Sequence, residues 1–161
     1  MHVLDDPVDV LANQPSLEWH LENLRSYVTV TNEFPEASQW RGAKLEPYAA
    51  GAGMRGIPGD CYSPSRFVKA AYLNASYPEK DSEKDNVIRM FRTLEGVAMV
   101  EGAARMGDGT FERTLYTSCF AAKSGRYYWS TYEDPAIRYV SLADAAGAPV
   151  DKLYVPEPRL R

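Results

Sequence analysis

The sequence predicts an α+β protein, with helices in its earlier part and an antiparallel sheet near its end. Apolar residues recur at helical spacing in three stretches, which begin near Ser16, Ser63 and Ser82. From Phe111 onward the chain is rich in Tyr, Thr and Trp, which β-strands favour, and short turns interrupt it. With an apolar fraction of 45%, the chain can bury a core and fold as a single domain over residues 1–161.

The net charge and the counts of histidine and cysteine exclude several kinds of partner and site. A net charge of -4 argues against nucleic acid or an anionic membrane surface as the main partner, and no apolar run is long enough to span a bilayer. With two histidines and two cysteines, Cys61 and Cys119, and no CxxC pair, we expect no metal site, and we expect no cofactor. The cysteines could form a disulfide, but isolated cysteines more often remain small buried apolar residues.

Residues 1–28 predict a short extended region followed by a helix. Apolar residues surround Asp5-Asp6-Pro7 and predict two short strands or a hairpin. Ser16 can cap the helix that follows. His20 lies in this helix, where a packed or hydrogen-bonded histidine is far more common than a ligand or a catalytic base. Four residues at helical spacing form its apolar stripe: Leu17, Leu21, Leu24 and Val28.

Between Thr29 and Tyr62 the helical periodicity fails, and prolines and glycines predict a long irregular excursion. Long loops in compact domains tend to be functional or mobile. One alternative is a surface loop that covers a neighbouring subunit or the missing half of a larger domain. The other is a wall of a substrate pocket, with Trp40, Tyr48 and Met54 as its lining.

The stretch from Ser63 predicts a helix with an unusual charge. Ser63 can cap it, and Pro64 suits its first turn, where a missing N–H costs nothing. Arg66 lies in the same turn, although the helix dipole there favours negative charge. Its position indicates that Arg66 holds an anion, a carboxylate or a thiolate. The alternative is a surface arginine beside an acidic neighbour.

The remainder predicts one more helix and then strands. Ser82 and Asp85 resemble a capping box for a helix that reaches about Ala104. Past Gly147 the proline-rich tail predicts an extended arm. Turns at Ser124-Gly125 and Asp134-Pro135 separate three predicted strands, over residues 111–122, 126–132 and 136–142.

Three motifs resemble the choloylglycine hydrolase and penicillin V acylase family. Residues 10–27, VLANQPSLEWHLENLRSY, are similar to the family's "VLTNSPTFDWHLTNLRNY" segment. Residues 58–71 contain PGD and then SPSRFVKAA, and resemble the family's "PGD…SPSRFVRAA" signature. Residues 127–133, YYWSTYE, look like its "YYrTYEN" strand. The resemblance runs through most of the chain, but it corresponds only to the C-terminal half of such a bacterial enzyme.

The resemblance implies part of a four-layer αββα fold of the N-terminal-nucleophile hydrolases, with two antiparallel sheets between helical layers. In that family an N-terminal cysteine attacks a linear amide, with its own α-amine as the base. By motif match, Asn13 would donate to the oxyanion and Arg66 would lie beside the nucleophile. The substrates implied are small-molecule amides: conjugated bile salts, penicillin V or N-acyl homoserine lactones. The complete enzyme is expected to be a homo-oligomer, a tetramer.

The chain also departs from the family pattern. It begins Met1-His2-Val3, so the resemblance implies that the nucleophile belongs to the missing N-terminal half, and we expect the chain alone to be inactive. Cys61 is internal and has no terminal amine; a triad of Cys61, His20 and a carboxylate is a remote alternative. Asp9 stands where the family usually has glycine, and it places a charge near a strand expected to be buried.

Two further questions stay open at this point. Instead of a hydrolase, the chain could be a non-catalytic fragment or a degenerate paralogue that binds a ligand or pairs with a separate N-terminal chain. Its localisation could be cytoplasmic or periplasmic, because the true N-terminus of the family's enzymes would lie upstream.

Overall fold

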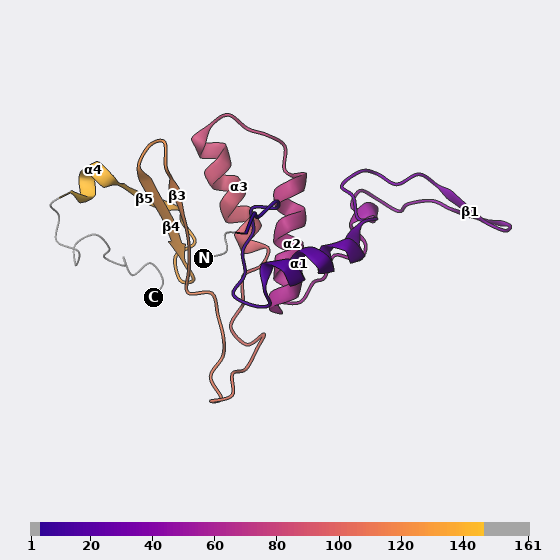
Figure 1. Ribbon diagram of the computed structural model, residues 1–161, viewed down its shortest axis with the longest axis horizontal. Coiled ribbons are helices and arrows are strands. Elements are labelled where there is room, and N and C mark those ends of the chain that lie inside the picture. The colour runs from indigo at the N-terminus through magenta and orange to yellow at the C-terminus, as the bar shows by residue number, and fades with distance from the viewer. Residues whose placement is uncertain (1–3, 147–161) are drawn as a thin grey trace. The chain divides into compact units, whose positions relative to one another are not determined.

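The computed structural model describes residues 4–146 and confirms the predicted α+β class (Figure 1). The chain divides into two compact units, which we treat separately: unit 1 ends at Tyr77 and unit 2 begins at Pro78. Unit 1 contains α1, α2 and a two-stranded hairpin, whereas unit 2 contains α3 and a three-stranded sheet. That the whole chain forms a single domain stays a prediction.

The first helix, α1 (Leu17–Leu24), begins where the sequence predicts. Ser16 is its N-cap, because the Ser16 hydroxyl accepts a hydrogen bond from the Trp19 N–H at 3.4 Å. The chain then tightens into a 3₁₀ turn, Arg25–Tyr27, and helical spacing is lost. Val28 is consequently exposed, so its predicted place in the apolar stripe is wrong.

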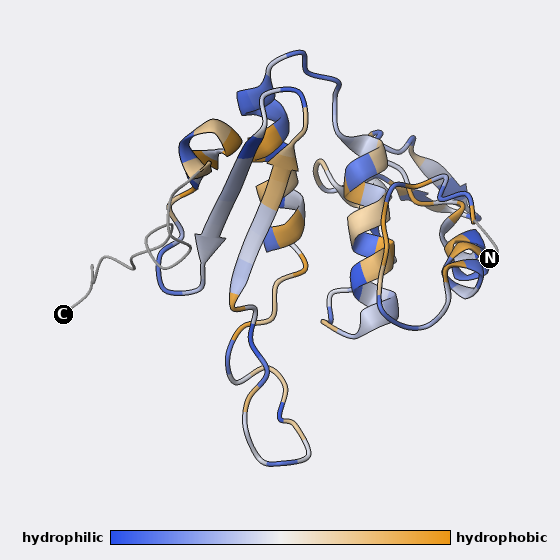
Figure 2. Cartoon of the chain, turned by 60° about the vertical axis from the view of Figure 1, so that its left-hand side comes forward, coloured by the Kyte–Doolittle hydropathy of each residue, from blue (hydrophilic) through white to orange (hydrophobic). Residues whose placement is uncertain are grey.

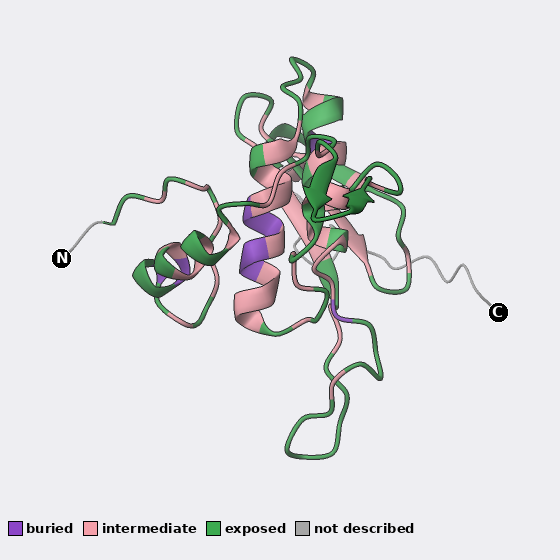
Figure 3. Ribbon diagram, turned by 90° about the vertical axis from the view of Figure 1, so that its right-hand side faces the viewer, coloured by how far each residue is buried: buried purple, intermediate pink, exposed green. Residues whose placement is uncertain are grey.

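The second helix, α2 (Ser63–Ser76), carries most of the buried residues of unit 1, and Figure 3 shows them in the middle of the helix. Hydrophobic and hydrophilic residues alternate along it, as in an amphipathic helix (Figure 2). Phe67 and Ala71 pack with Leu17 of α1 to form the core. Burying a large apolar side chain of this kind stabilises the fold by about 1.5–3 kcal/mol.

The segment before α1 is not extended, and the predicted strands are wrong, since residues 4–12 contain no strand. The Asp6 carboxylate accepts the Val8 N–H at 3.1 Å, and Asp9 has a left-handed φ of 53°. Glycine is favoured at such a φ, and aspartate is among the few other residues that tolerate it. Asp9 is exposed rather than buried in a strand. The Asn74 amide ties the segment to α2 by donating to the Val8 carbonyl at 3.0 Å.

The predicted irregular excursion is largely irregular, but it contains an antiparallel hairpin that the sequence analysis missed. Strands β1 (Ser38–Trp40) and β2 (Ala43–Leu45) pair with each other, and all their residues are exposed. The excursion closes through a short 3₁₀ helix, η2 (Ala52–Met54). At its base the Gly53 carbonyl accepts the Thr31 N–H at 3.1 Å.

In unit 2, α3 (Glu83–Glu95) begins at the predicted N-cap, Ser82. The Ser82 hydroxyl accepts the Asp85 N–H at 3.0 Å and donates to the Asp85 carboxylate at 2.7 Å. The helix stops at Gly96 instead of Ala104, because the residues that follow fold into turns. The predicted end of this helix is therefore wrong.

The predicted C-terminal strands are confirmed as one antiparallel sheet in the order β3 (Tyr116–Ala121), β4 (Arg126–Thr131) and β5 (Arg138–Ser141). Helix α3 packs beside β3 (Figure 1). The Tyr128 hydroxyl on β4 donates to the Glu83 carboxylate on α3 at 2.6 Å, and this bond lowers the pKa of Glu83. Aromatic side chains at Tyr116, Phe120 and Tyr127 are exposed.

Three other features complete the description. Cys61 and Cys119 are half-buried, and no disulfide joins them. Within residues 4–146, no helix is both long enough and apolar enough to cross a membrane. The extended arm predicted beyond Gly147 lies outside the described residues.

Candidate active site

The segment before α1 and the first turn of α2 meet at a pocket of about 600 Å³. This volume lies within the range of about 300–1,000 Å³ that is typical of small-molecule sites. Both walls belong to unit 1, although they lie far apart in the sequence. The lining consists of Asn13, Gln14, Pro15, Ser16, Tyr62, Ser63 and Pro64.

The start of α2 differs from the sequence prediction. The N-cap is Tyr62 and Ser63 is the first helical residue, so the predicted cap at Ser63 is wrong. The Ser63 hydroxyl instead donates a hydrogen bond to the Gln14 carbonyl across the pocket. This hydroxyl is therefore not free to cap the helix, and it joins the two walls.

Asp60 supports the start of α2, a role that the sequence analysis missed. Its carboxylate accepts the Tyr62 N–H at 2.9 Å and the Ser65 hydroxyl at 2.9 Å. The bond from the Tyr62 amide, followed by that from Ser65, lowers the pKa of Asp60. The signal for this role was an aspartate two residues before the N-cap of a helix whose first residues include serine.

Asn13 and Arg66, the two predicted catalytic residues, have different environments. Asn13 is exposed and lines the pocket. Arg66 lies in the first turn of α2 but is not part of the lining. Its Nε is buried and has no hydrogen-bond partner among residues 4–146, and a buried donor left unpaired costs about 1–3 kcal/mol. That these two side chains share one reacting centre stays a prediction.

Trp40, Tyr48 and Met54, predicted to line a substrate pocket, are all exposed. Trp40 lies on β1 and Met54 in η2, and none of the three lines the pocket at Asn13. Their role in substrate binding stays a prediction.

His20 lies in α1 and is only 1% exposed. Its ring stacks on Phe67 with centroids 4.1 Å apart, and Trp19 meets it edge-on at 5.5 Å. Burial lowers the pKa of His20, whereas the nearby Gln14 carbonyl acts in the opposite direction. Neither ring nitrogen has a partner in good hydrogen-bond geometry within residues 4–146, so the described residues show no contact through which His20 would activate the Cys61 thiol. The expectation of a packed histidine is confirmed.

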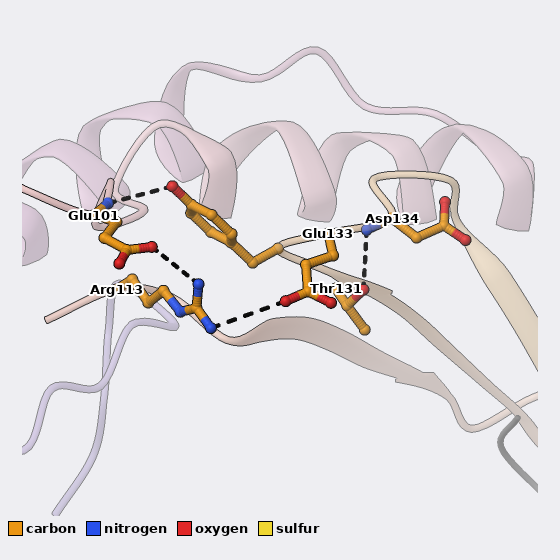
Figure 4. A network of polar contacts seen from close by, with 6 residues as sticks. Glu101, Arg113, Thr131, Glu133 and Asp134 are labelled. Carbon is orange, nitrogen blue, oxygen red and sulfur yellow. Dashed lines mark hydrogen bonds and ion pairs between the residues drawn. The ribbon is translucent and has the colours of Figure 1, made fainter. Parts of the chain in front are cut away.

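A separate polar network in unit 2 fixes the chain before β3 to the end of β4 (Figure 4). Arg113 contacts the carboxylates of Glu101 at 2.9 Å and Glu133 at 3.9 Å. The Tyr132 hydroxyl accepts the Glu101 N–H at 3.4 Å, and the Arg113 guanidinium lies over the Tyr132 ring. Partly exposed ion pairs of this kind have a structural role and contribute little stability singly.

The segment that carries Asn13 and the first turn of α2 are the walls of one pocket. Residues 1–146 match the family described as linear amide C-N hydrolases, choloylglycine hydrolase family. The chain belongs to this family, so the resemblance seen in the sequence is confirmed.

Curated relatives agree with this assignment. A bile salt hydrolase/transferase of Bifidobacterium longum is 56% identical over 144 residues, which cover 89% of this chain and 45% of the relative. A conjugated bile acid hydrolase of Lactobacillus acidophilus is 41% identical, with coverage of 89% and 46%. The chain thus spans about half the length of the curated relatives that it matches.

Solved structures show the same fold. A mutant of the conjugated bile acid hydrolase from Clostridium perfringens matches with a TM-score of 0.77 and 31% identity, over 88% of this chain and 43% of that one. Penicillin V acylase from Agrobacterium tumefaciens matches with a TM-score of 0.59 over 83% and 35%, and at 13% identity this likeness shows the fold alone. The chain has part of the predicted four-layer αββα fold.

Proposed function

We infer that this chain is the C-terminal part of a hydrolase that cleaves the amide bond of conjugated bile salts. The observation that carries the proposal is the pocket at Asn13, which has the volume of a small-molecule site and lies in a chain of this family. The relatives at 56% and 41% identity are named for bile salts or bile acids, which favours this substrate class over penicillin V and acyl homoserine lactones.

In this proposal Asn13 and Arg66 serve one reaction. A cysteine thiolate attacks the amide carbonyl, the carbonyl oxygen gains the negative charge, and the amine leaves once it is protonated. The exposed Asn13 side-chain amide, which faces the pocket, would donate to that oxygen. Arg66 would favour the thiolate through its positive charge, and its unpaired buried Nε–H is a donor that such a partner could satisfy.

The nucleophile would come from the part of the enzyme that this chain lacks relative to its relatives. The matched region covers 45% of the Bifidobacterium longum relative, so the proposal requires an N-terminal half as a partner. The exposed aromatic residues Tyr116, Phe120 and Tyr127 on the sheet of unit 2 are apolar surface that such a half could cover. The assembled enzyme would be a homo-oligomer, a tetramer.

A complementation experiment tests the proposal. The 161-residue chain is co-expressed with the part of the Bifidobacterium longum relative that lies outside the matched region, and release of the amino acid from a conjugated bile salt is measured. We expect hydrolysis by the pair and none by either part alone. Penicillin V and an acyl homoserine lactone serve as comparison substrates.

Two results would overturn the proposal. A stable complex of the two parts without turnover of any of the three substrates would favour the alternative of a non-catalytic paralogue that pairs with another chain. Hydrolysis by the isolated chain, abolished by a thiol reagent, would show that its own cysteine acts as the nucleophile.

A further inference from the structure

We propose that Ser63 is a positioning residue, whose hydroxyl fixes the backbone that carries Asn13 at the pocket. The inference rests on the proposed function only for the role of Asn13, since the contact itself is a property of unit 1. Ser63 acts through the backbone of Gln14, which is covalently joined to Asn13.

The Asn13 side chain has no support of its own. It is exposed, and within residues 4–146 it makes no hydrogen bond. The position of this side chain relative to the pocket therefore depends on the backbone that carries it. That backbone is anchored one residue later by the hydrogen bond from the Ser63 hydroxyl to the Gln14 carbonyl. An oxyanion donor must be fixed before the reaction, because reorganisation during the reaction reduces its contribution.

A second anchor lies one helical turn along α2. Ser63 and Phe67 are four residues apart and share one face of the helix. Phe67 stacks on His20, which belongs to the α1 helix that follows Gln14. The segment from Gln14 to His20 is thus attached to α2 at two points, and the first of these is the one next to Asn13.

Ser65 provides a matched control in the same turn. Its hydroxyl donates to the Asp60 carboxylate at 2.9 Å and so holds the loop before α2. Among the residues that the structure describes, it makes no hydrogen bond to the segment that carries Asn13. Loss of either hydroxyl removes one hydrogen bond at the start of α2, but only the Ser63 hydroxyl reaches the other wall of the pocket.

The test is an NMR experiment on the 161-residue chain with Ser63→Ala, Ser63→Thr and Ser65→Ala. In the unsubstituted chain we expect Asn13 and Gln14 to have backbone order parameters near the rigid value of about 0.85. Ser63→Ala should lower them toward the flexible range, below about 0.6, and should change the backbone amide chemical shifts of Asn13 and Gln14. Ser63→Thr keeps the hydroxyl and should restore them, and Ser65→Ala should leave them unchanged.

The fold of each variant is monitored at the same time. His20 is the only histidine within residues 4–146, and the ring current of Phe67 displaces its ring-proton signals as long as the stack persists. Unchanged Asn13 signals in Ser63→Ala with the stack intact would overturn the proposal, as would equal effects of Ser63→Ala and Ser65→Ala. If Ser63→Ala loses the stack, Ser63→Thr is compared with Ser63→Val, which has nearly the same shape; equal order at Asn13 in these two would also overturn it.

No step of this test involves catalysis. A chain that never hydrolyses an amide could still show the dependence of Asn13 on Ser63, and an active enzyme could fail to show it. Failure of the proposed function and failure of this inference are therefore distinguishable.

Discussion

The imidazole of His20 lies flat against the ring of Phe67, with 4.1 Å between the centroids and 11° between the planes. The two residues are 1% and 2% exposed. A protonated imidazole in this place would carry a charge out of water, which is unfavourable for a buried group. The contact between α1 and α2 consequently depends on a neutral histidine.

The first prediction concerns the pH dependence of stability. Burial lowers the pKa of His20 from its ordinary value of 6.5, so the unfolded chain binds a proton more readily than the folded chain. The contribution of neutral His20 to the free energy of unfolding should be complete above about pH 6.5. This contribution should decrease as the pH falls from there toward the lowered pKa. Urea unfolding between pH 7.5 and pH 5, with an NMR titration of His20, measures both quantities.

Replacement of His20 by a residue without a titrating proton provides the control. His20→Gln should flatten the stability profile in this window, even if it lowers stability at every pH. A profile of the unsubstituted chain that is already flat between these values, or a His20 that titrates at 6.5 or above, would contradict the prediction.

The second prediction concerns the proposed catalytic pair in the complemented enzyme. Asn13→Ala should lower kcat by about 10²–10³, the usual cost of one oxyanion donor, with little change in stability because Asn13 is exposed. Arg66→Ala should have a comparable effect. Arg66→Lys should restore little, since an ammonium cannot reproduce the planar fork of donors.

Steady-state kinetics with a conjugated bile salt, alongside thermal unfolding, provides the measurement. Changes within about threefold for both alanine variants, equivalent to about 0.7 kcal/mol, would show that neither side chain contacts the reacting atoms.

The third prediction concerns the internal thiol that precedes α2. Cys61→Ser should leave the activity of the complemented enzyme within about threefold, which corresponds to about 0.7 kcal/mol on the barrier. The reason is that Cys61 has no terminal amine and His20 is stacked elsewhere. A loss of several hundredfold with an unchanged circular dichroism spectrum would assign the nucleophile to this residue.

The fourth prediction concerns Gly53, at the base of the hairpin-bearing excursion. A Cβ at this position would lie 2.6 Å from the Thr31 carbonyl oxygen and 2.8 Å from that of Glu33, so backbone must shift to admit it. Gly53→Ala should destabilise unit 1 by roughly 1–3 kcal/mol, the usual cost of overpacking. Gly59→Ala is the matched control, because a Cβ there meets nothing within 4 Å.

Urea unfolding of both variants decides this prediction. Equal midpoints for Gly53→Ala and the unsubstituted chain would mean that the base of the excursion is loose. An equally large decrease in stability in Gly59→Ala would show that the destabilisation does not depend on the close contacts of a Cβ with neighbouring atoms.

The sequence predicted those elements whose signals are local. Ser16 and Ser82 mark helix starts by cap chemistry, and both are confirmed as N-caps. The family motifs also predict that Asn13 and the first turn of α2 belong to one site, and both line the same pocket. Asp9 stands where the resemblance implies a glycine. Its left-handed φ of 53° is a conformation that glycine adopts more readily than other residues.

The remaining features depend on contacts between distant residues or lack a clear local signal. Ser63 looks like a cap in the sequence, but its hydroxyl is used by Gln14, 49 positions earlier. The β1–β2 hairpin has no buried face, so its sequence lacks the alternation of apolar and polar residues that predicts a strand. The end of α3 at Gly96 reflects the turns that follow, while apolar residues continue at helical spacing beyond it.

The hydrogen bond between Ser63 and Gln14 closes a loop of 49 positions. The entropy of closing such a loop depends only weakly on the length of the loop. Loop-closure entropy grows only with the logarithm of length, so that doubling a flexible loop costs about 0.6 kcal/mol. The chain between α1 and α2 could therefore be lengthened, trimmed or exchanged with little effect on the pocket, provided that Gly53 and Ser63 keep their contacts. The sequence and length of the hairpin can therefore vary between proteins without a change in the pocket, although both belong to unit 1.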